Sequence, residues 1–166
     1  MTYCIEIPEL KIDNSQIAEL KNFYYENEDT YGITYKSKKE TVTELTIVGG
    51  YKKSEIIKNL ESKIDPKYID ASYFVSNYGI SAHTDDNRQC IISFEISNDE
   101  NIPINFHHLN KIEEKYYNKI PLMWNPQIEH SANNSRYKRI FFQIELKRDL
   151  IFKQYLELYQ TNKLLL

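Results

Sequence analysis

A series of short β-rich runs separated by turn-forming residues, all between positions 69 and 146, constrains the fold of this chain most strongly. We predict strands at 69–76, 89–96, 102–106, 120–124, 128–130 and 139–146, with Asn98–Asn101 as a turn. In the last run every second residue from Ile140 to Leu146 is apolar, so one face packs on an apolar layer while the face carrying Arg139 borders a polar cavity. Short strands of this kind predict a sandwich or jelly roll, in an α+β fold that is mainly β.

Helical patterns flank this β-rich region on both sides. One helix is predicted after the capping residues Asp13–Ser15, a second from Ser54 to Pro66, and a third over 150–165. The β-rich segment Thr41–Val48 is expected to join the sheet. A chain of 166 residues fits one domain. We expect that domain to consist of an α/β lead-in at 1–66, a jelly-roll core at 67–147 and a terminal helix at 148–166.

The composition excludes several classes of protein. Two cysteines, Cys4 and Cys90, are too few for a disulfide framework or a cysteine-rich zinc site. With four glycines, of which only Gly49 and Gly50 are adjacent, neither a phosphate-binding loop nor a dinucleotide fingerprint can be written. A net charge of −3 gives no nucleic-acid footprint, and no apolar run approaches the roughly 20 residues of a membrane span. Because the N-terminus also lacks the features of a signal peptide, we expect a cytoplasmic protein without nucleic-acid or membrane partners.

Four polar residues occur in an order that indicates a metal site. His83 and Asp85 follow a predicted strand, His130 lies at the end of another, and Arg139 begins the next. Residues i and i+2 of a strand point to the same face, so His83 and Asp85 can share one metal, whereas Asp86 would point away. Adding His130 gives the two-histidine, one-carboxylate facial triad of non-haem Fe(II) oxygenases, and Arg139 offers a planar fork for a carboxylate. Taken singly, each histidine is also typical of a loop and Arg139 of a salt bridge.

Around these residues the chain resembles a known family. Residues 69–146 are similar to the double-stranded β-helix (jelly-roll, cupin-like) core of the 2-oxoglutarate/Fe(II)-dependent oxygenases. The stretch His130–Ser135, followed by Arg139, resembles the aspartyl/asparaginyl β-hydroxylase and proline- or prolyl-hydroxylase-like branches. The other matching segments are 83–88, 90–96, 121–125 and 139–142. The helical patterns described above predict that helices from both ends of the chain flank this core.

The resemblance also implies a role for each matching residue. His83, Asp85 and His130 bind Fe(II), and Arg139 holds the distal carboxylate of 2-oxoglutarate. Arg88 either contacts the co-substrate as well or forms a salt bridge to Asp85 or Asp86. Further candidates on the same basis are Tyr73, as a co-substrate ligand or a core residue, and Asn125 and Trp124, as residues that line the pocket.

Two positions bear on the chemistry that the resemblance implies. Many relatives carry Ser or Thr two residues after the arginine, but Phe141 stands there in this chain. Either another hydroxyl assists Arg139, or Arg139 binds the carboxylate alone. Halogenating relatives replace the carboxylate ligand, whereas this sequence keeps Asp85, and that favours hydroxylation. His107 and His108, the remaining histidines, are expected to be exposed or packed rather than functional.

The implied activity is that of a dioxygenase that hydroxylates an amino-acid or peptidyl side chain and releases succinate and CO₂. Its cofactors would be Fe(II), 2-oxoglutarate and O₂, with ascorbate as an optional addition. The substrate, free or peptidyl, and the oligomeric state are left open. One alternative is a non-catalytic, cupin-like metal-binding or interaction module. Another is an oxygenase acting on nucleic-acid bases, which Arg136 and Arg139 suggest, although the arginine-rich signature of that branch is not reproduced.

Overall fold

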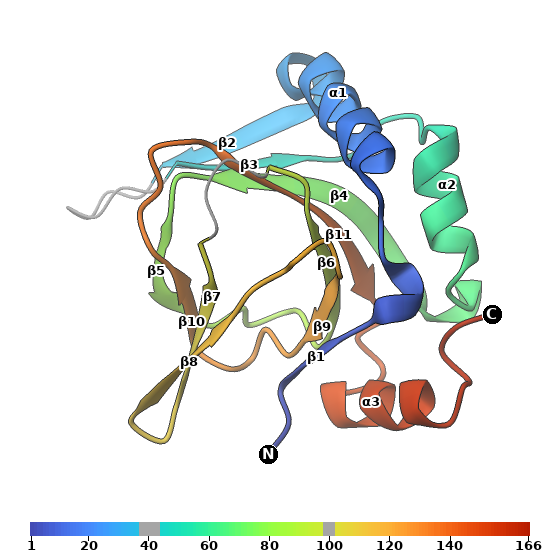
Figure 1. Cartoon of the computed structure of the whole chain (residues 1–166), viewed down its shortest axis with the longest axis vertical. Coiled ribbons are helices and arrows are strands. Elements are labelled where there is room, and N and C mark those ends of the chain that lie inside the picture. The colour runs from blue at the N-terminus through green and yellow to red at the C-terminus, as the bar shows by residue number, and fades with distance from the viewer. Residues whose placement is uncertain (37–43, 98–101) are drawn as a thin grey trace.

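Two antiparallel sheets face each other in the computed structural model, which describes residues 1–36, 44–97 and 102–166 (Figure 1). The strand order is β1-β9-β6-β11-β4-β3-β2 in the larger sheet and β5-β10-β7-β8 in the smaller. The larger sheet contains β1 (Cys4–Glu6), β2 (Gly32–Lys36), β3 (Glu44–Val48), β4 (Ile69–Asn77), β6 (Ile91–Glu95), β9 (Leu122–Trp124) and β11 (Arg139–Leu146). The smaller sheet contains β5 (Ile80–His83), β7 (Ile104–His108), β8 (Lys111–Lys115) and β10 (His130–Ala132). The predicted jelly roll is therefore confirmed.

Strand β11 separates two apolar cores. It lies between β4 and β6, and all eight of its residues are buried. Ile140, Phe142 and Ile144 face the helices and belong to the larger core. Phe141 faces the smaller sheet and packs with Phe106 of β7 in the second core. The predicted alternation along this strand is thus confirmed, and its inner face carries Arg139 into the space between the sheets.

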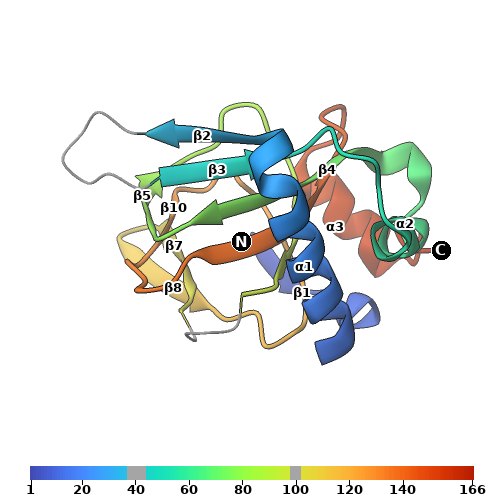
Figure 2. The ribbon, with the colours of Figure 1, turned by 90° about the horizontal axis from the view of Figure 1, so that it is seen from above.

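Three helices cover the outer face of the larger sheet (Figure 1, Figure 2). They are α1 (Asn14–Tyr31), α2 (Glu55–Ser62) and α3 (Phe152–Gln160), with short 3₁₀ turns at Pro8–Leu10 and Pro66–Tyr68. Each helix buries an apolar stripe against the sheet, including Tyr24 of α1, Leu60 of α2 and Tyr155 of α3. No helix within the described ranges is long and apolar enough to span a membrane.

The start of α1 is fixed by a reciprocal capping box. The Asp13 carboxylate accepts a hydrogen bond from the Gln16 backbone N–H (2.8 Å), and the Gln16 side-chain oxygen accepts one from the Asp13 N–H (2.9 Å). We expect Asp13→Ala to lower the free energy of unfolding by about 1 kcal/mol, since an orphan backbone donor loses its partner. Urea denaturation measures the change. Asp29→Ala, in the last turn of α1, is the matched control and should not destabilise, because a carboxylate there opposes the helix dipole.

Most predicted elements are confirmed, with shifted ends. The predicted strand at 139–146 coincides with β11, and that at 69–76 is β4. The second helix ends at Ser62, before Pro66, and the terminal helix ends at Gln160, because Asn162 adopts a left-handed conformation (φ 53°). Residues 41–43 of the Thr41–Val48 strand and the predicted turn Asn98–Asn101 lie outside the described residues.

Four strands were not predicted. They are β1, β2, β5 and β8. Strand β8, at the sheet edge, has mostly exposed residues with charged side chains, so no apolar alternation marks it. Strands β1, β2 and β3 all belong to the lead-in, yet they form both edges of the larger sheet. The lead-in therefore contributes strands to the sandwich as well as helices that cover it.

Candidate active site

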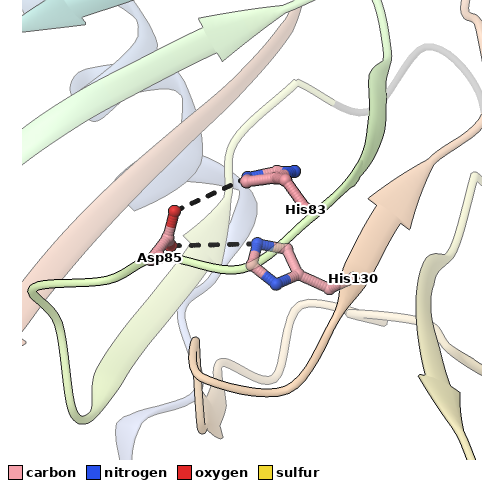
Figure 3. Close-up of side chains that lie close together, drawn as sticks. All are labelled: His83, Asp85 and His130. Atoms are coloured by element: carbon pink, nitrogen blue, oxygen red, sulfur yellow. Dashed lines mark ion pairs between the residues drawn. The ribbon is translucent and has the colours of Figure 1, made fainter.

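His83, Asp85 and His130 lie close together between the two sheets (Figure 3). His83 is the last residue of β5 and His130 the first of β10, and the two residues pair directly across the strands. This register brings the imidazole rings to a centroid distance of 4.3 Å. The Asp85 carboxylate reaches both rings, with Oδ1 3.5 Å from His83 Nε2 and Oδ2 3.8 Å from His130 Nε2. The two imidazoles and the carboxylate thus form one small polar cluster.

The sequence pattern predicted that Asp85 lies on the same strand as His83. Asp85 instead lies in the loop that follows this strand. Strand β5 ends at His83, and the chain turns immediately afterwards. The Asp85 N–H donates to the Pro126 carbonyl (2.9 Å), and the Gln127 side-chain amide donates to the carbonyls of Asp85 and Arg88. The loop that precedes β10 therefore holds the loop that follows β5, while the neighbouring Asp86 is exposed.

Both histidines are oriented with Nε2 toward the cluster. His83 Nδ1 lies 2.8 Å from the Ser81 carbonyl and His130 Nδ1 lies 2.9 Å from the Ile128 carbonyl. A carbonyl can only accept, so each Nδ1 carries a proton and each Nε2 is the ring nitrogen left to bind a metal. Burial lowers the pKa of His130 to about 4, which keeps that ring neutral near pH 7. Two imidazoles and a carboxylate form a donor set suited to a divalent metal.

Arg88 lies directly behind the carboxylate. Its Nη2 donates to Asp85 Oδ2 (2.7 Å), and its Nη1 donates to the hydroxyl of Tyr73 (2.9 Å) and to Gln143 Oε1 (3.3 Å). Burial raises the pKa of Tyr73 to about 12, so the phenol stays protonated and donates to Glu145 (3.0 Å). Of the two expectations for Arg88, the salt bridge to Asp85 is present, and the guanidinium also borders the cavity.

Arg139 projects from the start of β11 into the same cavity. Its Nε donates to Glu95 Oε1 (3.0 Å) and its Nη2 to the Ile102 carbonyl (2.8 Å). Nη1 is buried and has no hydrogen-bond partner within the described part of the chain. Burial raises the pKa of Glu95, and the guanidinium opposes that rise by favouring the carboxylate. Sequence reasoning missed Glu95, which lies at the end of a predicted strand with nothing in the sequence to mark it.

The cavity that these groups border has a volume of about 200 Å³. It is small, since pockets for drug-sized ligands measure roughly 300–1,000 Å³. The indole of Trp124 lines it and packs edge-on against His130 at 4.7 Å. Its Nε1 is the second buried donor here that finds no partner among the described residues. Two of the side chains that line the cavity, Arg139 and Trp124, thus each carry a buried donor without a partner among the described residues.

The other candidates from the sequence lie elsewhere. Tyr73 and Asn125 are not among the described residues that line the cavity. The Asn125 side chain instead accepts from the Gln127 N–H (3.0 Å). His107 bonds Ser131 through Nε2 (2.8 Å), and His108 packs beside Tyr3, in agreement with packed roles for both.

Tyr117 is a further hydroxyl-bearing residue among those that line the cavity. The ring of Tyr117 packs against Phe141 at 5.5 Å and lines the same cavity as Arg139. Its hydroxyl donates to Ser93 (3.2 Å), and burial raises its pKa. Tyr117 precedes a predicted strand and carries no motif, so only the fold places it at the site.

Comparison with known proteins places the fold in a class. No protein-family model matches the sequence, and the curated proteins give no match. Among solved structures, a prolyl-4-hydroxylase of Pseudomonas putida is similar, with a TM-score of 0.60 and 7% identity over 89% of this chain and 94% of that one. The α-ketoglutarate-dependent epimerase SnoN is similar with a TM-score of 0.62 and 8% identity, over 86% of this chain and 77% of that one. HygX of Streptomyces hygroscopicus, solved with nickel and 2-oxoglutarate bound, has a TM-score of 0.58 and 7% identity, over 87% of this chain and 82% of that one.

These similarities identify the fold as that of the 2-oxoglutarate/Fe(II)-dependent oxygenases. The family resemblance seen in the sequence is thereby confirmed for the architecture. The similar proteins differ in the reaction they catalyse, since one is a hydroxylase and another an epimerase. The fold alone does not define a reaction, which has to be argued from the residues of the site.

Proposed function

We propose that this protein is an Fe(II)- and 2-oxoglutarate-dependent dioxygenase that hydroxylates an amino-acid or peptidyl side chain. The observation that carries the proposal is the cluster of His83, Asp85 and His130 in one cavity with the unsatisfied Nη1 of Arg139. The three side chains of the cluster would bind a metal, and Arg139 would bind a carboxylate of a dicarboxylate co-substrate. The fold supports it, because similar structures include one with nickel and 2-oxoglutarate bound.

The donor set fits iron. Two ligands that each lie roughly 2.0–2.2 Å from one metal can be at most about 4.4 Å apart. Asp85 Oδ1 lies 3.5 Å from His83 Nε2, within that limit, and one ligand atom from each of the three residues lies within 4.8 Å of the other two. Three protein ligands leave coordination positions open for a co-substrate and O₂. In this proposal Arg88 holds Asp85 in place through Oδ2 and leaves Oδ1 directed toward His83.

The cavity fits 2-oxoglutarate as well. A carboxylate satisfies the orphan Nη1 of Arg139, and a further acceptor satisfies Nε1 of Trp124. When bound, iron and 2-oxoglutarate supply the oxidising power, with conversion of the co-substrate to succinate and CO₂. The chain itself orients the ligands, neutralises the carboxylate and excludes water with the apolar walls of the cavity. Hydroxylation in particular is supported by the prolyl hydroxylase among the similar structures and by the retained Asp85.

Anaerobic titration with Fe(II), followed by 2-oxoglutarate, tests the proposal. We expect a visible charge-transfer band on addition of 2-oxoglutarate and succinate formation once air is admitted. A protein that binds the metal but neither binds 2-oxoglutarate nor forms succinate would be the non-catalytic, cupin-like module. Hydroxylated product, identified by mass spectrometry, distinguishes hydroxylation from epimerisation.

Removing the support of Asp85 should weaken metal binding without removing a ligand. We expect Arg88→Gln to lower Co(II) affinity by roughly 10–100-fold, because groups that orient a ligand carboxylate typically contribute that much. Titration of the metal-free protein measures the loss. Arg136→Gln is the matched control, because Arg136 is exposed and outside the cavity lining. Equal affinities for the two variants would show that Arg88 does not position Asp85.

A further inference from the structure

An apolar strip extends from the cavity to the free edge of the larger sheet. Ile33 of β2 pairs with Ile47 of β3, Ile47 with Val75 of β4, and Val75 with Phe141 of β11. Directly opposite residues of antiparallel strands share a face. Since Ile47, Val75 and Phe141 line the cavity, Ile33 continues their row beyond it.

A second pair widens the strip at its outer end. Tyr35 lies opposite Leu45, which also lines the cavity. Ile33 and Tyr35 are 60% and 53% exposed although they face the interior side of the sheet. Figure 2 shows β2 as the outermost strand with β3 beside it. Two large apolar side chains are thus left exposed next to the cavity, and an exposed apolar surface beside a cavity is where a ligand is expected to bind.

The length of the strip indicates a ligand larger than one amino acid. From Ile33 to Phe141 it crosses three interstrand spacings of roughly 4.8 Å, or about 14 Å in all. An extended chain advances at most roughly 3.3–3.6 Å per residue, so about four residues cover this distance. The cavity of about 200 Å³ is small for a co-substrate and a whole substrate together. The rest of the substrate must therefore lie outside it, over the strip.

The charges of the site indicate a neutral ligand. The described charged or titratable side chains that line the cavity include the three proposed metal ligands, Arg88 and Arg139. Arg88 is paired with Asp85, and Arg139 with Glu95. On the β2–β3 hairpin, Lys36 and Glu44 pair with each other. Among the described residues, no side chain of the strip can neutralise the ammonium or carboxylate of a free amino acid, and an unpaired charge is costly to bury.

We infer that the substrate is an uncharged, apolar segment of an extended peptide, about four residues long, that lies across this strip with one side chain in the cavity. The inference rests on the proposed dioxygenase function and deepens it. The cavity wall also carries neutral amide groups on Asn77 and Gln143, whose side-chain NH₂ groups can donate to peptide carbonyls, since only their oxygens are used in hydrogen bonds to Gly79 and Arg88. Among the described residues of this wall, the charged side chains are either proposed metal ligands or already paired. None of them is left to pair with the ammonium or carboxylate group of a free amino acid.

The single tryptophan, Trp124, provides a binding assay that needs no turnover. The probe is a pool of N-acetylated, C-amidated tetrapeptides of Ala, Val, Leu, Pro and Phe, titrated into the protein loaded with Co(II) and 2-oxoglutarate. We expect the pool to change the Trp124 fluorescence with a Kd at least about tenfold below that of the free amino acids, a difference of about 1.4 kcal/mol. Equal or tighter binding of the free amino acids would overturn the inference.

Variants locate the binding surface. Ile33→Asp should raise the peptide Kd at least about tenfold, whereas Ile112→Asp should leave it unchanged. Ile112 is 65% exposed on β8, the edge strand of the smaller sheet, and is therefore a matched control. Overlaid thermal unfolding curves establish that both variants are folded. Equal peptide affinities in the two variants would overturn the assignment of the strip.

The failure of this inference is distinguishable from that of the proposed function. Wild-type protein that forms succinate from 2-oxoglutarate but neither binds the tetrapeptide pool nor is stimulated by it retains the dioxygenase function and loses the peptide assignment. Protein that binds the pool but never binds 2-oxoglutarate or forms succinate loses the dioxygenase function, and with it the assignment of the peptide as substrate.

Discussion

Replacing His130 with alanine is expected to abolish succinate formation and to reduce metal affinity by more than roughly 100-fold, above the range for groups that only support a ligand. His130 is buried, its Nδ1 is committed to the Ile128 carbonyl, and its Nε2 is directed at the cluster. The low pKa of this ring keeps it neutral, so no proton has to leave before a metal binds near pH 7. Calorimetric titration with Co(II) and a succinate assay measure the two effects.

Two further variants make the result decisive. His130→Gln retains most of the side-chain volume beside Trp124, so loss of metal binding in both variants cannot come from collapse of the packing. His108→Ala removes a histidine that packs against Tyr3 and should leave the metal affinity at the wild-type value. If His130→Gln binds metal as tightly as His108→Ala, His130 is not a ligand.

Replacing Arg139 should affect stability and co-substrate binding separately. We expect Arg139→Gln to lower the free energy of unfolding by roughly 3–5 kcal/mol, because Glu95 is then a buried charge without its partner. The same variant should lose 2-oxoglutarate binding, since it removes the buried guanidinium nitrogen that has no hydrogen-bond partner among the described residues. Urea denaturation and calorimetry measure the two effects.

The pH dependence of that stability loss follows from Glu95. Burial already raises the pKa of Glu95 in the folded protein, and loss of the guanidinium raises it further. A carboxyl with a raised folded pKa favours folding while it is protonated, and this contribution disappears as the pH rises through the folded pKa. Arg139→Gln should therefore be least destabilised in mildly acidic buffer and most destabilised in mildly alkaline buffer.

A double variant separates the two roles of Arg139. Glu95→Gln combined with Arg139→Gln should recover most of the stability and remove its added pH dependence, because no buried charge remains. It should not recover 2-oxoglutarate binding. A double variant that binds 2-oxoglutarate like the wild-type protein would contradict the proposed role of Arg139.

Sequence patterns predicted the strands that alternate cleanly and the residues that carry a motif. Strand β11 was predicted with its correct ends, because a central strand between two apolar layers must alternate. His83, Asp85 and His130 were expected to lie together, and the structure brings them together. The physical reason was only partly right, since Asp85 is held by hydrogen bonds from a neighbouring loop rather than by strand periodicity.

Other parts of the site could not be predicted because they depend on register between distant strands. Glu95 pairs with Arg139 only because β6 lies next to β11 in one particular alignment, which no local pattern encodes. Trp124 was named as a candidate, but its unsatisfied indole N–H becomes visible only when its neighbours are known. The strip that ends at Ile33 likewise requires the order of four strands, including β2, which the sequence did not reveal.

The direct pairing of His83 with His130 has a consequence for folding. These residues belong to strands of four and three residues, which are distant in the chain and meet at a register shift. Closing so long a loop costs conformational entropy that such short strands repay poorly. A metal held by both histidines would act as a cross-link between them. In the bound state it would add stability that increases with the logarithm of metal concentration, so metal supply would set how firmly the smaller sheet is closed.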